Sequence, residues 1–368
     1  MSEHHSHQMH QGGNGVHETA DNRHDAFLHT QTAPFDVKTP VSAAGLIQGM
    51  AGTSFQARNL ASAVRIWRNM MGDECTVFLG LAGAMVPAGM RNILRYLIEE
   101  RFVDVIVSTG ANMFHDVYET LGMPHWQTRA DADDIELGRR RINRFYDVLA
   151  AENDFADAEE FVVAFSQTLE SDRPYSTREY FERIGRAMIP MAKEDGILTA
   201  AARAGVPIYS PALGDSVHGL AIATARIRTG HRLMFDIIGD VLESSHIALG
   251  SKATGVVYIG GGTPKNYIQQ AEVAAYIYSR EVPGHRYGIQ ITMDQPQWGG
   301  LSGATFEEAQ SWRKIAPDAD FVTLNVEATV ALPLIVSALA EQLPDNRNQR
   351  VLPVLDFGPS AAEKARLP

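Results

Sequence analysis

The sequence predicts an α/β protein with a doubly wound, mainly parallel, Rossmann-like sheet, helices on both faces and a helical insertion. Two patterns support this prediction. Short apolar runs end in Gly, Ser, Thr or Asp and are followed by stretches with helical periodicity. The runs are continuously apolar rather than alternating, which is typical of strands that helices cover on both faces. A repeated strand-then-helix order needs crossover connections, and these give parallel strands.

Six apolar runs are expected to form the strands. In chain order they span residues 76–81, 103–107, 206–209, 255–259, 287–292 and 321–325. The first leads into a helix that ends near Glu100, and the last precedes an apolar helix over residues 330–339. Residues 129–195 are charged and helical in pattern, which predicts a helical insertion packed on the sheet. Its arginine-rich cluster at 139–144 indicates a solvated helix face rather than an anion site.

Length and composition indicate one domain preceded by an extension. The chain has 368 residues, of which 45% are hydrophobic and 21% charged, as in ordinary globular proteins. Residues 1–35 are polar, lack a hydrophobic period and hold seven of the thirteen histidines. We expect this His-rich segment to be disordered, although its closely spaced histidines also suit a transition metal. A single domain is expected over residues 36–368.

Charge and cysteine content exclude several classes of function. The net charge of −12 argues against a general basic surface and therefore against a nucleic-acid partner. No apolar stretch reaches about 18 residues and the N-terminus is polar, so we expect a cytoplasmic protein without membrane contact. Cys75 is the only cysteine, which excludes an intrachain disulfide and a Cys-based zinc site. It is expected to be a buried structural thiol, and no metal site is predicted.

Two predicted strand ends are suited to binding a ligand. Ligands of open parallel sheets bind beyond the carboxyl ends of the strands. One strand here ends in Ser-Thr-Gly at 108–110, and another ends in three glycines at 260–262 that enter a helix. Glycines at a helix N-terminus let the backbone approach a phosphate closely. Neither turn matches GxGxxG or a P-loop, so a tight strand-to-helix connection explains both equally well.

Residues 298–315 combine a Gly-rich loop with a short helix that contains reactive groups. Thr305 and Glu308 form a capping-box pattern. Glu308 and Trp312 lie four residues apart and therefore share a helix face, which offers a carboxylate and an aromatic ring to an alkyl ammonium group. Lys314 follows, and a partly buried lysine can form a Schiff base. An amphipathic helix with a solvated lysine is the competing interpretation of these residues alone.

Several segments resemble the deoxyhypusine synthase family, in order, over residues 45–340. The resemblance rests on Phe-Leu-Gly at 78–80, Ser-Pro-Ala-Leu-Gly-Asp at 210–215, Tyr-Ile-Gly-Gly-Gly at 258–262 and Glu-Ala-Gln-Ser-Trp-Arg-Lys-Ile at 308–315, together with residues 52–57, 90–98 and 103–109. It is strongest around Lys314. In that family NAD takes a hydride from spermidine, and the aminobutyl group passes through a lysine imine to an acceptor amine.

The resemblance implies roles for named residues. Lys314 is the imine-forming lysine, with Trp312 and Glu308 beside it in the polyamine channel. The implied cofactor is NAD, and its expected contacts are Thr109, Gly110, Asp215, Gly261, Gly262, Glu327, Ala328 and Thr329. The family also implies a homotetramer with active sites between subunits.

The chain also departs from the family pattern. His115 stands where the family has a glutamate, and Asn266 where it has a histidine. Leu220 and Leu301 replace two aspartates that bind the substrate in the family, and His218 lies close to Leu220 in sequence. Glu327 replaces another aspartate. Gly83-Ala84 and Pro87-Ala88 replace polar pairs near the cofactor. We expect His115 to act as a catalytic base, and His218 is an equal candidate for that role. Asn266 and His218 are expected to bind the substrate. The remaining histidines of the domain, His125 among them, are expected to be structural.

The resemblance predicts an NAD-dependent aminoalkyl transferase that passes an aminobutyl group between small amines, as in homospermidine formation. Fewer carboxylates weaken attraction for a polycation, which favours an altered donor or acceptor. The first alternative is a true deoxyhypusine synthase, whose acceptor is a lysine of a translation factor. The second is a protein that binds NAD or polyamines without turnover.

Overall fold

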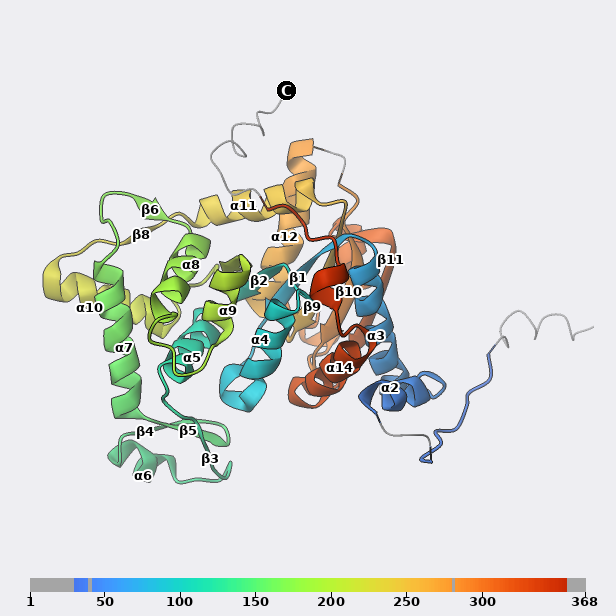
Figure 1. Cartoon of the computed structure of the whole chain (residues 1–368), viewed down its shortest axis with the longest axis horizontal. Coiled ribbons are helices and arrows are strands. Elements are labelled where there is room, and N and C mark those ends of the chain that lie inside the picture. The colour runs from blue at the N-terminus through green and yellow to red at the C-terminus, as the bar shows by residue number, and fades with distance from the viewer. Residues whose placement is uncertain (1–29, 39–41, 280–281, 356–368) are drawn as a thin grey trace, which may run out of the picture.

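The computed structural model describes residues 30–38, 42–279 and 282–355, so most of the predicted N-terminal extension lies outside the described residues. Its centre is a six-stranded sheet in the order β11-β10-β9-β1-β2-β7, and every pair of neighbours is parallel (Figure 1). The strands are β1 (Cys75–Leu81), β2 (Val105–Ser108), β7 (Ile208–Tyr209), β9 (Ala253–Ile259), β10 (His285–Ile291) and β11 (Ile315–Leu324). All six predicted strands and the doubly wound α/β fold are confirmed.

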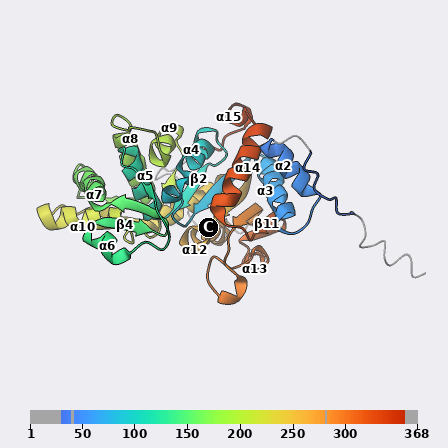
Figure 2. The same ribbon diagram turned by 90° about the horizontal axis from the view of Figure 1, so that it is seen from below.

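Helices cover both faces of the sheet. They are α2 (Ala43–Ala51), α3 (Phe55–Gly72), α4 (Arg91–Glu99), α5 (Gly110–Thr120), α9 (Ile197–Ala204), α10 (Val217–Thr229), α11 (Ile237–Gly250), α12 (Gly262–Ser279), α13 (Phe306–Ser311), α14 (Ala328–Gln342) and α15 (Asn346–Gln349), with a π-helical turn η1 (Val86–Met90) and a 3-10 turn η2 (Pro296–Trp298). Viewed along the sheet, α3, α4 and α14 lie on one side and α12 and α13 on the other (Figure 2).

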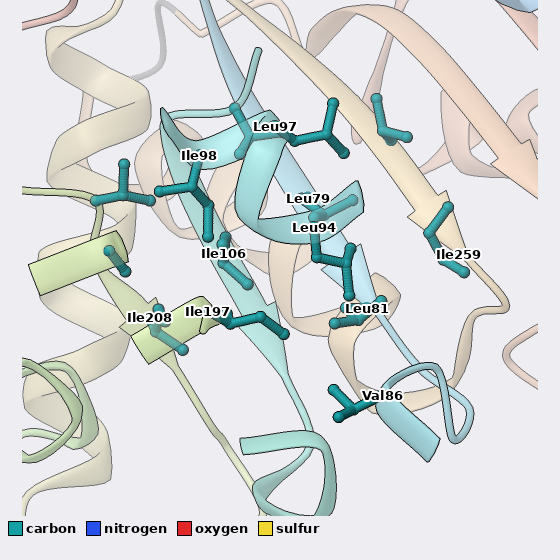
Figure 3. Close-up of a cluster of buried hydrophobic side chains, with 14 of the residues drawn as sticks. Leu79, Leu81, Val86, Leu94, Leu97, Ile98, Ile106, Ile197, Ile208 and Ile259 are labelled. Atoms are coloured by element: carbon teal, nitrogen blue, oxygen red, sulfur yellow. The ribbon is translucent and has the colours of Figure 1, made fainter. Parts of the chain in front are cut away.

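Alternate strand residues point into two hydrophobic cores, as the period of a β-strand requires. On one face, Leu79 of β1 and Ile106 of β2 pack with Leu94 of α4, within the cluster of buried side chains in Figure 3. On the other face, Phe78 belongs to a core that includes Ile268 of α12. Both faces are therefore sealed by apolar side chains, which explains why the strand sequences do not alternate with polar residues.

The chain reverses its direction across the sheet between β1 and β9. From β1 it proceeds to β2 and β7 on one side, and then returns to β9, β10 and β11 on the other. The turns after β1 and β9 thus flank a topological switch point, where open α/β sheets bind ligands. The turns that carry Thr109, Gly261 and Glu327 all follow carboxyl ends of strands of this sheet.

The insertion between β2 and β7 contains strands as well as helices. Its helices are α6 (Asp134–Arg139), α7 (Glu152–Gln167) and α8 (Thr177–Met188). A small antiparallel sheet joins β3 (Trp126–Gln127), β5 (Val148–Ala151) and β4 (Ile142–Phe145), and β6 (Pro174–Tyr175) pairs with β8 (Met234–Phe235). The predicted helical insertion therefore contains its helices, but residues 142–145 and 148–151 are strands rather than helix.

A tight hairpin explains this difference. Only Tyr146 and Asp147 separate β4 from β5, and Tyr146 adopts a positive φ of 55°. Arg144 of β4 donates to both carboxylate oxygens of Asp134 at the start of α6. Arg144 is therefore part of a strand, and the predicted helix face over 139–144 ends at Arg139 of α6.

In the described ranges, no helix combines the length and apolar character needed to cross a bilayer.

Candidate functional site

The end of α13 fixes the position of Lys314. The amide of Lys314 donates to the carbonyl of Ala309 at 3.1 Å, and that of Arg313 donates to Gln310 at 3.0 Å. These two bonds form a Schellman motif, with Arg313 in the left-handed region at φ 59°. A non-glycine residue there costs roughly 1–2 kcal/mol. The guanidinium of Arg313 offsets part of this cost by donating to the Tyr276 hydroxyl at 2.8 Å.

The side chain of Lys314 lies among the residues predicted to surround it. Its Nζ donates to Oδ1 of Asn266 on α12 at 3.4 Å and lies 5.7 Å from the ring centroid of Trp312. Lys314 is half-buried, and burial lowers the pKa of its ammonium while Glu308 opposes that shift. Trp312 itself is 64% exposed. The structure therefore brings together Lys314, Asn266, Trp312 and Glu308.

The predicted start of α13 is also present. Thr305 is the N-cap, and its hydroxyl accepts from the amide of Glu308 at 3.0 Å. This cap sets the first turn of α13 and thereby the face that carries Glu308. Glu308 is exposed to solvent, so its carboxylate remains accessible to a cationic ligand.

Lys265 is a second lysine beside this cluster, and sequence reasoning did not select it. It is 1% exposed, and its Nζ donates to Oε1 of Gln290 at 2.8 Å and to the carbonyl of Ala304 at 2.5 Å. Burial lowers the pKa of Lys265 to about 8, Glu308 opposes this shift and the nearby Lys314 adds to it. Its position directly before Asn266, in the first turn after three glycines, was the available sequence signal.

The triple-glycine turn after β9 lies against the Gly-rich loop before α13. Gly260 and Gly262 have φ values of 72° and 56°. A Cβ on Gly261 would lie 2.5 Å from the Cα of Ser302, and the amide of Gly262 donates to Oγ of Ser302 at 2.9 Å. The backbone at this helix N-terminus is thus held close to a second backbone segment, an approach that only glycine permits.

Two further turns of the carboxyl edge are capped in similar ways. Thr109 is the N-cap of α5 and accepts from the amide of Asn112 at 3.3 Å. A Cβ on Gly110 would lie 2.3 Å from Oγ of Ser216, so this turn packs closely on the loop that carries the exposed Asp215. At α14, the exposed Glu327 is the N-cap and accepts from the amide of Thr329 at 2.9 Å.

A cavity of about 1330 Å³ opens at this edge of the sheet. Ala84 and Pro87 from the turn after β1 line it, together with Glu327 and Thr329 at the start of α14. Pockets for drug-sized ligands measure roughly 300–1,000 Å³, so this cavity has room for a dinucleotide. The carboxylate of Glu327 and the hydroxyl of Thr329 in this lining can accept hydrogen bonds from hydroxyl groups of a ligand. Part of the predicted cofactor set therefore lines a cavity of suitable size.

His115 belongs to a hydrogen-bonded series of three side chains. Its Nδ1 lies 3.0 Å from Nε2 of His125, and Nδ1 of His125 lies 2.7 Å from Oε1 of Glu119. His115 is 6% exposed, and burial together with His125 lowers its pKa to about 3. His125 and Glu119 also line the large cavity. Sequence reasoning expected His125 to be structural, and these contacts give it a partner on each side.

His218 is enclosed by aromatic rings. It is fully buried on α10, with its Nδ1 3.0 Å from the Tyr180 hydroxyl and its ring packed edge-on against Phe181. Burial lowers the pKa of His218 to about 3. The contacts within this chain are those of a core histidine, and they do not place the ring beside Lys314.

The structure also separates His115 from Lys314 within one chain. α5 follows β2, whereas Lys314 directly precedes the edge strand β11, four places away in the sheet. Neighbouring strands lie about 4.8 Å apart, which separates the two strands by roughly 19 Å. Lys314 does not line the large cavity. In the described ranges, no group of three His, Cys, Asp or Glu side chains is arranged to hold a metal ion.

Comparison with known proteins places this fold in a family. The family model described as deoxyhypusine synthase matches residues 45–339. The chain belongs to the deoxyhypusine synthase family. Members named as deoxyhypusine synthases are transferases, and the matched segment contains α13, Lys314 and all six strands of the central sheet.

Relatives in this family cover most of the chain. "Probable deoxyhypusine synthase 2" of Methanosarcina mazei is 46% identical over 345 residues, which is 93% of this chain and 99% of the relative. "Deoxyhypusine synthase-like protein" of Elusimicrobium minutum is 35% identical over 82% of this chain and 81% of its own. The crystal structure of a "putative deoxyhypusine synthase" from Entamoeba histolytica superposes with a TM-score of 0.58 at 20% identity, covering 84% and 96% of the two chains, and it shares the fold.

Proposed function

We propose that this member of the deoxyhypusine synthase family is an NAD-dependent aminoalkyl transferase. It takes an aminobutyl group from a polyamine such as spermidine, holds it as an imine on Lys314 and passes it to a small acceptor amine, as in homospermidine formation. The observation that supports this most is the setting of Lys314. It is half-buried, has a lowered pKa and lies beside an amide, an aromatic ring and a carboxylate.

Lys314 has the properties of an amine nucleophile. Because burial disfavours its ammonium form, a larger fraction of the amine is neutral at a given pH than for a surface lysine. The neutral amine attacks the carbon of the donor imine, and release of the departing amine leaves the aminobutyl group on Lys314. Asn266 orients the Nζ, and the Trp312 ring with Glu308 offers a place for the distal ammonium group of the substrate.

The carboxyl edge of the sheet fits the cofactor that the family uses. Glu327 and Thr329 line the large cavity, and Thr109, Gly110, Asp215, Gly261, Gly262 and Ala328 stand at neighbouring strand ends. A Cβ on Gly262 would meet nothing within 4 Å, so there is open space at the N-terminus of α12, which suits a pyrophosphate. When bound there, NAD would supply the hydride acceptor for the donor and the hydride for the final reduction.

The replaced carboxylates favour a small acceptor amine. Leu220 is 60% exposed and Leu301 49% exposed, so both positions offer apolar surface where the family pattern has aspartate. The second candidate is a true deoxyhypusine synthase acting on a protein lysine, and the name of the Methanosarcina mazei relative favours it. The third is binding of NAD or a polyamine without turnover.

A homotetramer is proposed as the working assembly. Trp298 and Trp312 are 67% and 64% exposed and flank the loop that carries Leu301. Exposed aromatic residues at this density are typical of protein interfaces. A second copy placed there would shield Lys314 from water.

Product analysis tests the proposed function. The purified protein is incubated with NAD, spermidine and putrescine, and the products are identified by mass spectrometry. A new homospermidine-type amine that requires NAD supports the proposal. Labelling of a translation-factor lysine without any new small amine would establish the second candidate. Absence of both products, with no release of NADH, leaves binding without turnover.

A further inference from the structure

A buried carboxylate on α11 is hydrogen-bonded to the first residue of α8. Asp240 is 1% exposed, and its oxygens accept from the amide of Thr177 at 3.0 and 3.2 Å and from the Thr177 hydroxyl at 2.7 Å. Thr177 is itself fully buried and begins α8. The Asp240 carboxylate therefore satisfies both hydrogen-bond donors of this threonine at a place that solvent does not reach.

Thr177 in turn holds the residue that follows β7. Its hydroxyl oxygen accepts from the amide of Ser210 at 2.9 Å. Ser210 is buried and begins the loop over residues 210–216, which leads into α10 and contains Asp215, one of the expected NAD contacts. Asp240 is thus connected to this loop by two consecutive hydrogen bonds.

The loop over 210–216 is also packed closely against its neighbours. A Cβ on Gly110, at the start of α5, would lie 2.3 Å from Oγ of Ser216. A Cβ on Gly219, in the first turn of α10, would lie 2.7 Å from the carbonyl oxygen of Gly214. Close packing transmits displacements, so a shift at the first residue of the loop alters its fit at the carboxyl edge of the sheet.

The hydrogen bonds around Asp240 favour its ionised form. The amide and the hydroxyl of Thr177 are both donors, and an ionised carboxylate is purely an acceptor. In this state a series of bonds runs from the Ser210 amide through the Thr177 hydroxyl to a negative charge, and each bond strengthens the next. Protonation removes the charge and adds a hydrogen that faces a donor. The hold of Thr177 on Ser210 is then weaker.

Burial opposes this preference. It raises the pKa of Asp240 from 3.8 to about 7, although the hydrogen bonds from Thr177 lower it, and the charge of Glu243 adds to the increase. Asp240 is therefore mostly ionised above about pH 7 and mostly protonated below it. Both forms of the network are populated under ordinary conditions.

The other ionisable groups that face Asp240 come from α8, α11, β7 and α12. Arg178 donates to Glu243 at 2.7 Å, and the Tyr209 hydroxyl donates to Glu243 at 3.2 Å. Burial raises the pKa of Tyr209 and of Tyr267 on α12, so both stay neutral near pH 7. Burial alone would lower the pKa of Arg178, but its hydrogen bond to Glu243 raises it. The charges of these two tyrosines and of Arg178 are therefore constant near pH 7.

We propose that Asp240 is a pH-sensitive positioning residue whose ionised form, acting through Thr177 and Ser210, holds the loop over 210–216 in the arrangement that binds NAD. The identity of the ligand rests on the proposed function. A ligand that binds better to one of two states shifts the equilibrium towards that state. NAD should therefore bind more tightly above pH 7 than below it, and its binding should release protons near pH 7.

Calorimetry of NAD binding tests the proposal without measuring activity. We expect a dissociation constant about 2- to 10-fold lower at pH 8 than at pH 6, as for the strength of one hydrogen bond. Titrations at pH 7 in two buffers with different ionisation enthalpies should show the release of up to about half a proton per NAD. Equal affinity at the two pH values, without proton release, would overturn the proposal.

Two asparagine variants on α11 provide the matched comparison. Asp240→Asn resembles the protonated carboxyl, so at pH 8 it should bind NAD as weakly as the wild type does at pH 6, and release no proton. Asp236→Asn makes the same change at the exposed N-cap of α11, where asparagine caps equally well, and should keep the wild-type pH dependence. A folded Asp240→Asn protein that keeps this pH dependence contradicts the role of Asp240.

Thr177 provides a second comparison that does not alter the carboxylate. Thr177→Val removes the hydroxyl and should abolish the pH dependence of NAD binding, whereas Thr177→Ser retains the hydroxyl and should restore it. These variants decide the matter if Asp240→Asn does not fold. Equal pH dependence in the valine and serine variants would show that the hydroxyl does not connect Asp240 to Ser210.

Hydrogen exchange of the NAD-free protein tests the positioning separately from the cofactor. Corrected for intrinsic rates, the amides over 210–216 should be less protected at pH 6 than at pH 8 in the wild type, and equally protected at both in Asp240→Asn. Unchanged protection in the wild type would overturn the proposal. If NAD binds at neither pH, the proposed cofactor fails, whereas hydrogen exchange still decides whether Asp240 positions the loop.

Discussion

Nζ of Lys314 lies 3.4 Å from Oδ1 of Asn266, so the proposed nucleophile faces a neutral amide at the position where the family pattern has an ionisable histidine. The amide orients the lysine without adding a charge to it. This contact joins α12 to the end of α13. It links the triple-glycine turn to the lysine through four residues of one helix.

Replacing Asn266 with aspartate tests this neutrality. A carboxylate at hydrogen-bonding distance favours the ammonium form, so the pKa of Lys314 rises in Asn266→Asp. We expect the pH at which half of the protein forms a borohydride-trapped adduct to increase by about one unit or more. Asn266→Ala, which adds no charge, serves as the control. If half of the protein forms the adduct at the same pH in Asn266→Asp and Asn266→Ala, then residue 266 does not control the pKa of Lys314.

The exposed carboxylate of Glu308 is expected to attract the donor weakly. Exposed ion pairs contribute roughly 0.2–1 kcal/mol, so Glu308→Gln should weaken donor binding by about 1.4- to 5-fold. Glu307→Gln removes a neighbouring exposed carboxylate from the same turn of α13 and provides a matched control. Binding of spermidine is measured by calorimetry in low and high salt. Equal effects of the two variants would mean that general surface charge, rather than Glu308, attracts the donor.

Gly261 is expected to tolerate no side chain. The Cβ of Gly261→Ala would meet the Cα of Ser302 at 2.5 Å, and the overlap has to be relieved by moving one of two backbone segments. Overpacking of this kind costs typically 1–3 kcal/mol. We therefore expect a lower free energy of unfolding and weaker NAD binding. Gly300→Ala is the control because a Cβ there meets nothing within 4 Å. Equal NAD affinity in the two variants would contradict the assignment of this turn.

Buried Lys265 should make stability depend on pH. Its pKa is about 8 in the folded protein, below the ordinary value of 10.5, so the unfolded chain binds more protons between these values. Stability therefore rises with pH from about 8 to 10.5, by about 3 kcal/mol for this group alone. Other groups also titrate in this pH range, so the contribution of Lys265 is taken as the difference in unfolding free energy between wild type and Lys265→Met. A difference that stays constant from pH 7.5 to 10 would show that Lys265 has an ordinary pKa.

Local patterns were sufficient to predict the fold. Continuous apolar runs such as 255–259 identified the strands, because each strand is covered on both faces. The hairpin around Tyr146 was missed because its strands are only four residues long and follow directly on three arginines at 139–141, so the segment resembled a charged helix. The pairing between β4 and β5 outweighs that local preference.

The candidate site could be predicted only in part. Lys314, Trp312 and Glu308 lie within seven residues of one another, so their proximity follows from one helix end. Lys265 was missed because its burial depends on Gln290 and Ala304, which are distant in sequence. His125 was missed because the bend after α5 that returns it to Glu119 and His115 cannot be read from helical periodicity.

The most direct test of the central claim is covalent trapping at Lys314. Protein is incubated with NAD and spermidine, reduced with borohydride and digested, and the peptides are analysed by mass spectrometry. The proposal predicts an aminobutyl adduct on Lys314 that requires NAD and disappears in Lys314→Ala. Lys252 is a surface lysine paired with Glu74, and the control variant Lys252→Ala should retain the adduct. NADH formation without an adduct on Lys314, or an adduct that persists in Lys314→Ala, would contradict the proposal.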